Sequence, residues 1–425
     1  MKMRIEKIKI SNFKSFDELE VKLDNFNVLI GQNASGKSNF IEIFRFLRDI
    51  CKFDLINAVS MQGGANYLRN MSIKNRKDLH IGLELGAKYT IMLGPLKDNN
   101  NRLLTLNVEH VAYDFSIKFN KRGLGYNVSD EALFQEGNFA EMKIDKNGRL
   151  KQGRLLGQGF LRSIRSEDGT IKEETPTSEI EKVDYVPFLE ARRRKLEPKH
   201  LIIRELPSAS HLRHFLESIA CYDFDPKLSK RAVAITGKAD LEEDGSNLAI
   251  VLKNIAEGTK TNRDKFASLL RDNLPFISDW DVQRSIDKSL IFTVKENYFQ
   301  SYMPSAILSD GTINIISLIV ALYFERTRSM TIIEEPERAI HPSLLSKAID
   351  MIKDISKQKQ LLLSTHNTEI VKFTELQSLL LVSRNKYGFS VVAKPAESST
   401  VKTFLENEMG LEELFVDNLL QGPDA

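Results

Sequence analysis

The clearest chemical signal in this sequence is an eight-residue loop, Gly31 to Ser38. It matches the pattern G-x-x-x-x-G-K-S, in which backbone N–H groups surround a phosphate, the lysine neutralises charge and the serine hydroxyl ligates Mg²⁺. The apolar run 26–30 before it predicts a buried strand, and the apolar spacing of residues 40–47 after it predicts a helix, whose positive end would face an anion. We therefore expect a nucleoside triphosphate here. The residues expected to contact it are Gly31, Gln32, Asn33, Ala34, Ser35, Gly36, Lys37, Ser38 and Asn39.

A second predicted strand, beginning at Met330, ends in the acidic residues Glu334 and Glu335. Carboxylates at the carboxyl edge of a parallel sheet are what a metal-dependent nucleotide hydrolase requires. We expect Ser38 and Glu334 to hold Mg²⁺, directly or through water, and Glu335 to orient or deprotonate the attacking water. The alternative interpretation is a strand end with solvated acids. Asp is commoner at the metal position, and the longer Glu334 favours an outer-sphere contact.

Three further groups are candidates for contacts with the triphosphate. The segment Leu308–Thr312 (LSDGT) precedes a predicted helix, so Ser309, Asp310 and Gly311 form a second candidate anion site; a helix cap without a ligand is the alternative. His366 follows a predicted strand at 360–365 and would contact the γ-phosphate. Gln62 is a candidate metal and water contact by its position alone.

Composition limits the class of protein. The 425 residues predict two or three compact units, and 60 Lys and Arg against 58 Asp and Glu leave a net charge of +2. Two cysteines, Cys51 and Cys221, have no ligand-like spacing and suit a reducing compartment. The most apolar segment, 313–324, is shorter than the roughly 20 residues that span a bilayer, so it predicts a buried helix. No secretory signal is recognisable, and we expect a cytoplasmic protein without a membrane partner.

Periodicity outlines the rest of the chain. Residues 4–23 alternate as in strands, and residues 76–120 predict further short strands broken by a turn cluster at 98–101. Charge then comes in blocks: the basic segments 141–165 and 191–204 flank an acidic one. Such blocks are typical of solvated, irregular insertions, although Arg192, Arg193 and Arg194 would also suit phosphates. From Ser208 to Phe224 the apolar residues have helical spacing, and strand character returns near 290–294.

The ordered motifs resemble a known family. NFKSF (12–16), GQNASGKSN (31–39), LSDGT (308–312), IIEEPE (332–337) with the following IHP, and STHN (364–367) are similar to the ABC-type ATPase heads of the SMC, RecF and OLD families. The chain most resembles short forms without a coiled coil or Toprim nuclease, as found in anti-phage systems such as PARIS and Septu. Its last residues, MGLEELFVDNLLQG, also resemble the family's terminal segment.

The resemblance implies an α/β fold: a P-loop NTPase of the ABC-type ATPase head kind with a β-rich insertion and a helical subdomain. Residues 1–100 would carry the phosphate loop (Walker A), 101–204 the insertion, 205–284 the helical subdomain, and 285–425 the signature, acidic strand (Walker B) and switch histidine. Lys14 and Phe16 are candidates for the adenine contact.

The resemblance also implies how the chain would act. ATP and Mg²⁺ would be bound by Lys37 and Ser38 of one protomer and capped by Ser309 and Gly311 of a second, giving a homodimer or a higher oligomer. Hydrolysis would be slow and dimer-dependent, with Glu335, His366 and Lys37 as catalytic groups. A separately encoded effector would be the partner. The alternatives are a RecF-like repair ATPase that binds DNA through the basic segments, and a weakly hydrolysing ATP-gated scaffold.

Overall fold

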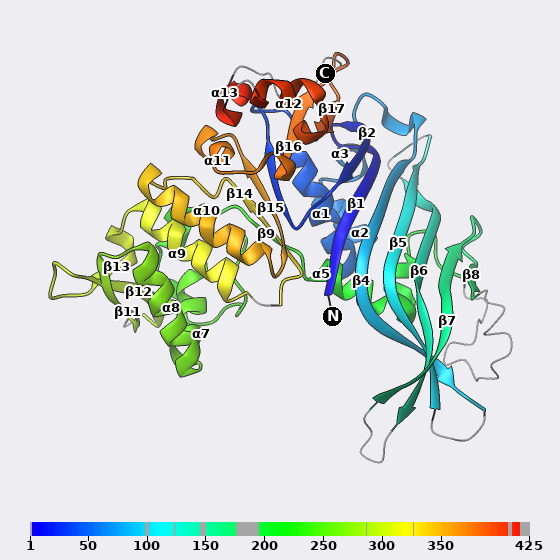
Figure 1. Ribbon diagram of the computed structural model, residues 1–425, viewed down its shortest axis with the longest axis horizontal. Coiled ribbons are helices and arrows are strands. Elements are labelled where there is room, and N and C mark those ends of the chain that lie inside the picture. Colours follow the sequence, from blue (N-terminus) through cyan, green and yellow to red (C-terminus); the bar gives the residue numbers. More distant parts are fainter. Residues whose placement is uncertain are drawn as a thin grey trace. The chain divides into compact units, whose positions relative to one another are not determined.

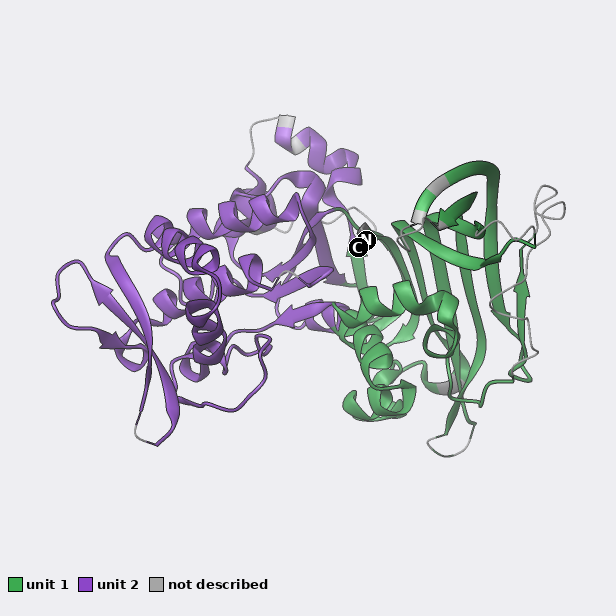
Figure 2. Ribbon diagram, turned by 90° about the horizontal axis from the view of Figure 1, so that it is seen from below, with its two compact units in different colours: residues 1–24, 42–218, 384–392 green, residues 25–41, 219–383, 393–425 purple. Residues whose placement is uncertain are grey.

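A computed structural model describes residues 2–97, 102–121, 123, 125–144, 150–175, 195–285, 287–325, 327–406 and 410–416 (Figure 1). The chain forms two compact units (Figure 2). Unit 1 consists of residues 1–24, 42–218 and 384–392, and unit 2 of residues 25–41, 219–383 and 393–425. Both units are therefore built from segments that are distant in the sequence. The four-segment division by motif stays a prediction.

Unit 1 is built on a seven-stranded antiparallel sheet with the order β2-β1-β4-β5-β6-β7-β8. Its strands alternate buried and more exposed residues, the period of a sheet with one covered face. They are β1 Lys2–Phe13, β2 Phe16–Lys22, β4 Leu79–Pro95, β5 Arg102–Phe119, β6 Tyr126–Ile144, β7 Leu150–Arg165 and β8 Ile171–Glu174.

The strands of this sheet are longer than the sequence predicts. In place of short strands over 76–120, β4 and β5 pair from Leu79 opposite Ile117 to Pro95 opposite Leu103. Register shifts near Gly86 and Met92 interrupt the alternation locally, because an extra residue at a bulge bends a strand without ending it. The basic segment 141–165 likewise contains the regular strand β7, while residues 98–101 and Arg192, Arg193 and Arg194 lie outside the described residues.

Helices cover one face of the unit 1 sheet. Phe46 of α1 packs against Phe13 of β1 with ring centroids 6.0 Å apart, and His211 of α5 stacks on Tyr89 of β4. The helix α1 (Lys37–Lys52) begins in unit 2 and continues into unit 1. The other helices of unit 1 are α2 Leu55–Met61, α3 Ala65–Leu68, α4 Ile202–Glu205 and α5 Ser210–Glu217, with 3₁₀ turns at Lys74–Arg76 and Pro207–Ala209.

A buried carboxylate joins α4 to this sheet. Glu131 of β6 is only 1% exposed, and it accepts hydrogen bonds from the Ile202 N–H at 2.7 Å and from the Tyr113 hydroxyl at 2.7 Å. Burial raises the pKa of Glu131 to about 7, although these hydrogen bonds partly oppose the increase. The folded state therefore binds a proton at this carboxyl more tightly than the unfolded chain does.

We expect the Glu131 carboxyl to make unfolding pH-dependent. The stabilising effect of protonation is fully present below pH 4.5, the ordinary pKa, and is lost as the pH rises through about 7. The loss amounts to up to about 3 kcal/mol, and Glu131→Gln should remove this part of the pH dependence. Urea unfolding of both proteins at pH 5 and pH 8 measures the difference. Identical pH slopes for the two proteins would contradict the assignment.

Unit 2 contains five parallel strands in the order β16-β3-β15-β14-β9. They are β3 Phe26–Ile30, β9 Ala220–Tyr222, β14 Met330–Glu334, β15 Gln360–Thr365 and β16 Leu379–Arg384. Almost every residue of these strands is buried, as expected for a parallel sheet covered on both faces. The strands expected at 26–30, from Met330 and before His366 are thus confirmed, and the one from Met330 ends at Glu334. A further strand, β17 Ser390–Ala393, pairs with β16.

The helices of unit 2 share one apolar core with the sheet. The buried helix expected over 313–324 is confirmed as α9, Asp310–Tyr323, and none of the helices in the described residues is long and apolar enough to cross a membrane. The other helices are α6 Pro226–Ser229, α7 Leu248–Glu257, α8 Lys260–Asn273, α10 Pro342–Ser356, α11 Thr368–Lys372, α12 Ser399–Glu406 and α13 Leu411–Val416.

The region expected to be helical is mixed. The helices α5, α7 and α8 are present, but the apolar pattern from Ser208 does not continue as a helix to Phe224: α5 ends at Glu217, and the next apolar residues form β9. Parallel pairing with β14 outweighs the local helical spacing here. A small sheet of β10 Val233–Ala234, β11 Ile277–Arg284, β12 Ser289–Glu296 and β13 Met303–Pro304 completes unit 2, together with 3₁₀ turns at Ser305–Ile307, Leu376–Ser378 and Pro395–Glu397.

Candidate functional site

Three neighbouring parallel strands of unit 2 end at the same edge. In the register of the sheet, Glu334 of β14 lies opposite Ser364 of β15, and Ser364 lies opposite Leu29 of β3. The segments that follow these strands are the phosphate loop, the acidic turn at 335–337 and His366. Ligands bind outside the carboxyl ends of strands in open α/β sheets, so the pairing aligns the three predicted motifs at one edge.

The phosphate loop is shaped by close backbone approach. A Cβ atom on Gly31 would lie 2.3 Å from the carbonyl oxygen of Val382, so only glycine fits. Ala34 and Gly36 have positive φ angles of 61° and 119°, and α1 begins directly after them at Lys37. Its first turn carries no acidic residue. The loop therefore leads into the positive end of a 16-residue helix, an arrangement that suits an anionic ligand.

Lys37 is held inside this loop. Its Nζ donates hydrogen bonds to the carbonyl oxygens of Gly31 at 2.7 Å and Gln32 at 3.1 Å. Burial lowers the pKa of Lys37, and the charges of Glu335 and Glu337 partly oppose this. The ammonium group thus interacts electrostatically with the carboxylates that follow β14, as the predicted site requires.

Glu335 lies at the centre of a network of charges. One carboxylate oxygen is 2.9 Å from His366 Nδ1 and the other is 3.3 Å from a guanidinium nitrogen of Arg338. Arg338 is held in turn by Asp223 at 2.9 Å. The backbone of Glu335 has a positive φ of 43°, and its N–H donates to the Ser364 carbonyl oxygen at 2.9 Å. A strained backbone at such a position is typical of functional sites, where the surrounding contacts maintain it.

Glu337, for which the sequence predicts no role, belongs to the same network through Thr365. It is 7% exposed, and one of its oxygens accepts a hydrogen bond of 2.5 Å from the Thr365 hydroxyl. Its other oxygen is buried with no hydrogen-bond partner among the described residues. Burial raises the pKa of Glu337. The signal in the sequence was its place in IIEEPE, two residues after Glu335.

The LSDGT segment forms the start of α9. Ser309 is the N-cap, and its Oγ accepts a hydrogen bond from the Thr312 N–H at 3.1 Å. Asp310, in the first turn, pairs with Lys230. A Cβ on Gly311 would lie 2.5 Å from the Ala339 carbonyl oxygen, so the backbone of the chain approaches closely at this glycine. Ser309 itself is exposed.

The remaining predicted site residues lie on three elements. Ser38 and Asn39 are in the first turn of α1, and Glu334 is the half-buried last residue of β14. Gln62 belongs to unit 1, where it caps α2 and its Nε2 donates to Glu42 Oε2 at 2.8 Å. Phe16 is fully buried, and Lys14 lies 4.0 Å from Glu42.

The donor set fits ATP with Mg²⁺. A nucleotide-bound Mg²⁺ keeps several waters and needs only one or two protein oxygens, such as the Ser38 hydroxyl and the Glu334 carboxylate. The narrow turn at Gly31 and the partly buried Lys37 suit a polyphosphate.

Comparisons with known proteins agree with this arrangement. A family model described as "AAA ATPase domain" matches residues 3–147, and one described as "AAA domain, putative AbiEii toxin, Type IV TA system" matches residues 192–372. The chain is 45% identical to Endonuclease GajA of Bacillus cereus over 47 residues, which are 11% of this chain and 8% of that protein. It is 27% identical to DNA replication and repair protein RecF of Lactobacillus acidophilus over 179 residues, which are 37% of this chain and 48% of that protein.

Among solved structures, an SMC head bound to the C-winged helix domain of ScpA is similar with 12% identity and a TM-score of 0.47. The match covers 92% of this chain and 97% of that one. The chain spans less than half the length of the two curated relatives above.

The ordered motifs, the parallel sheet that aligns them and the matched ATPase models define the class. The chain has the fold and motifs of an ABC-type ATPase and is similar to AAA ATPase domains and to RecF proteins. RecF proteins of several bacteria are among the proteins with similar sequences.

Proposed function

We propose that this protein binds ATP with Mg²⁺ and hydrolyses it to ADP and phosphate. The observation that carries the proposal is that four side chains lie together at one sheet edge. The charges of Glu335 and Glu337 raise the pKa of Lys37 against the effect of burial, and Glu335 contacts His366. A cation for the phosphates, a carboxylate for water and a histidine for the γ-phosphate are the parts that phosphoryl transfer to water needs.

The roles follow from chemistry. The N–H groups of residues 31–38 and the Lys37 ammonium would bind the β- and γ-phosphates, and Ser38 with Glu334 would hold Mg²⁺, which supplies charge neutralisation. Glu335 would accept the proton of the attacking water, because its carboxylate is half-exposed and held in place by Arg338 and His366. His366, about half-exposed, would contact the γ-phosphate while remaining within reach of Glu335. Gln62 stays a candidate metal contact.

We further propose that ATP joins two copies of the chain. The start of α9 presents an exposed Ser309 and the positive end of a 14-residue helix, which can receive the γ-phosphate of a nucleotide bound by a second protomer. Hydrolysis would then be slow and dimer-dependent, and ATP would act as a switch through its different contacts in the open and closed dimers. A weakly hydrolysing scaffold would use the same geometry.

The dimer proposal is tested by Ser309→Arg in a Glu335→Gln background, which should retain ATP. Without Ser309→Arg, ATP should shift the mass toward even-numbered oligomers. The larger side chain of Ser309→Arg should obstruct the interface and reduce ATP-dependent dimer formation at least about tenfold. The affinity for ATP should stay within about threefold of that of the background protein. Mass photometry with and without ATP and Mg²⁺ measures this. Ser399→Arg, at the exposed start of α12, is the matched control. Equal dimer formation by the Ser309 and Ser399 variants would refute the role of the signature.

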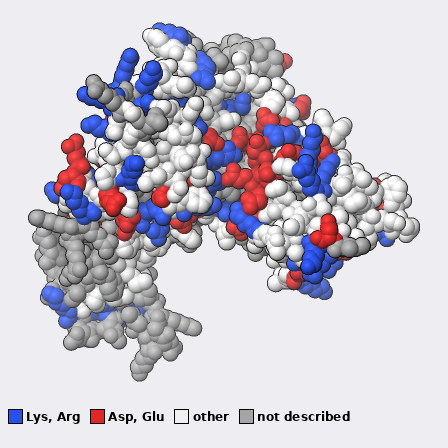
Figure 3. Space-filling model, turned by 180° about the vertical axis from the view of Figure 1, so that it is seen from behind, with Lys and Arg blue, Asp and Glu red and all other residues white. Residues whose placement is uncertain are grey.

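The process that the switch controls is proposed to be anti-phage defence through a separate effector. Support comes from the motif resemblance and from the family description that names a putative toxin of a type IV toxin–antitoxin system. The RecF matches favour a second candidate, a DNA-binding repair ATPase. On the face drawn in Figure 3, basic and acidic side chains stand among one another, in keeping with a net charge near zero. DNA affinity that falls steeply with salt and is lost on replacing Arg192, Arg193 and Arg194 would favour repair.

A further inference from the structure

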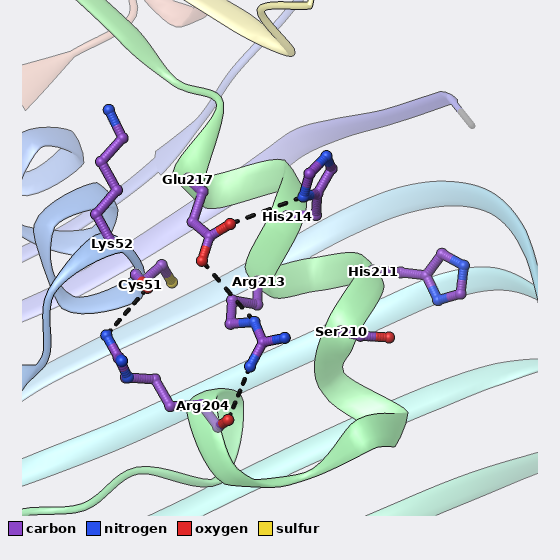
Figure 4. Close-up of a pocket in the computed structure, with 8 residues that line it drawn as sticks. All are labelled: Cys51, Lys52, Arg204, Ser210, His211, Arg213, His214 and Glu217. Carbon is purple, nitrogen blue, oxygen red and sulfur yellow. Dashed lines mark hydrogen bonds and ion pairs between the residues drawn. The ribbon is translucent and has the colours of Figure 1, made fainter.

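Unit 1 contains a cavity that the ATPase proposal does not use. It has a volume of about 460 Å³ and lies where α1 ends, beside α4 and α5 (Figure 4). Small-molecule sites have volumes of roughly 300 to 1,000 Å³, so this cavity is large enough for a ligand of several heavy atoms.

The walls of this cavity are rich in cationic side chains. Lys52, Arg204 and Arg213 line it, and Glu217 is the acidic residue among its lining residues. With the two lining histidines neutral, the cavity carries two net positive charges. A phosphate monoester has a charge of about −1.5 to −2 at pH 7, which matches this excess.

The two arginines are anchored differently. Arg204 donates from one guanidinium nitrogen to the carbonyl oxygens of Ile50 and Cys51, both at 3.1 Å, and so satisfies the last turn of α1. Arg213 donates to the Arg204 carbonyl oxygen at 2.8 Å. Arg204 is therefore structural as well as charged. Arg213, whose side chain is 37% exposed, is the better candidate for a ligand contact.

The acid in the cavity is only loosely engaged. Glu217 lies 3.8 Å from Arg213 Nε and 3.7 Å from His214 Nδ1, and both distances exceed those of hydrogen bonds. Dashed lines in Figure 4 mark these two ion pairs. An anion with several oxygens can give Arg213 the short, charge-assisted hydrogen bonds that Glu217 does not.

The chemistry of the cavity does not suit a metal. Cys51 is a buried free thiol, and burial raises its pKa, which disfavours the thiolate form. The ring of His211 is stacked on Tyr89 with centroids 4.3 Å apart, which fixes its orientation. The histidines at 211 and 214 belong to no group of three potential metal ligands among the described residues.

We propose that this cavity binds a small phosphate-bearing molecule, with Arg213 as the principal contact and Lys52 and Arg204 supplying further positive charge. A nucleic acid is less suited, because its affinity comes from many phosphates along an extended surface, whereas these cations surround one cavity. The proposal does not rest on the ATPase function, since none of these residues belongs to the nucleotide site.

Binding of radiolabelled inorganic phosphate, measured by equilibrium dialysis at constant ionic strength, tests the proposal. The full chain with Lys37→Ala serves as background, so that the phosphate loop contributes little. We expect Arg213→Gln to weaken binding about tenfold and Glu217→Gln to tighten it about threefold to tenfold, because one removes an attraction and the other a repulsion. A merely structural role would not give opposite signs. Arg213→Lys should recover part of the affinity.

Two results would overturn the proposal. One is phosphate binding that neither substitution changes. The other is the absence of phosphate binding in the background protein. Binding of a single-stranded oligonucleotide that Arg213→Gln abolishes would then make the cavity part of a nucleic-acid surface. Unchanged melting temperatures of the Glu217→Gln and Arg213→Gln proteins serve as the folding control.

Discussion

Replacing Lys37 with alanine is expected to weaken ATP binding at least about 100-fold, because truncating one partner of a buried charge pair costs about 2–5 kcal/mol. Lys37 is partly buried beside the loop carbonyls and interacts with Glu335 and Glu337, so its loss removes a positive charge from the nucleotide site. Titration with a fluorescent ATP analogue measures the loss.

The matched control for this experiment is Lys372→Ala, which removes an exposed lysine of α11 and should leave the affinity unchanged. Lys37→Ala should leave the protein folded, because the hydrogen bonds of Lys37 within the described residues go to two carbonyl oxygens of the loop itself. If Lys37→Ala binds ATP with an affinity within threefold of that of the unmodified protein, the phosphate loop is not part of the nucleotide site.

Replacing Glu335 with glutamine should reduce the rate of ATP hydrolysis by about 10²- to 10⁴-fold, the range that general-base catalysis contributes. The amide keeps the size of the side chain and one oxygen for His366, but it cannot accept the proton of water. ATP affinity should stay within about threefold, and the ATP-bound dimer should accumulate. Single-turnover phosphate release and mass measurement report the two effects separately.

Glu375→Gln, at an exposed carboxylate before the turn at Leu376–Ser378, is the control for loss of a negative charge and should leave turnover unchanged. If Glu335→Gln hydrolyses ATP at the original rate, another group activates the water. Glu337 would then be the next candidate, since its second oxygen is buried without a partner among the described residues.

The parts of the site that depend on local sequence were predictable. A glycine-rich loop between an apolar run and a helical pattern defines strand, loop and helix by periodicity alone, and Ser309 is a cap by its residue type and place. The strands predicted from Met330 and before His366 are present as β14 and β15, and β14 ends at Glu334. These features are determined by residues that lie within one helical turn or one strand of each other.

Other parts depend on contacts between distant segments. The spacing of apolar residues that predicts a helix from Ser208 to Phe224 is also compatible with an edge strand near its end. Pairing with β14 makes this end the strand β9. Arg338 could not be linked to Asp223 from the sequence, since 115 positions separate them and only the loop after β9 brings them within 2.9 Å. The burial of Glu337 likewise depends on Thr365 of another strand.

The sequence by itself determined the chemical inventory: a phosphate loop, two acidic candidates after a strand, a capped helix and a histidine at a strand end, because residue type and short-range spacing carry that information. Only the tertiary structure decided which of these groups meet. Parallel pairing sets Leu29, Ser364 and Glu334 side by side, and the burial that follows lowers the pKa of Lys37 and raises the pKa of Glu337. Proximity across hundreds of residues and the desolvation it causes are properties of packing, and no local pattern encodes them.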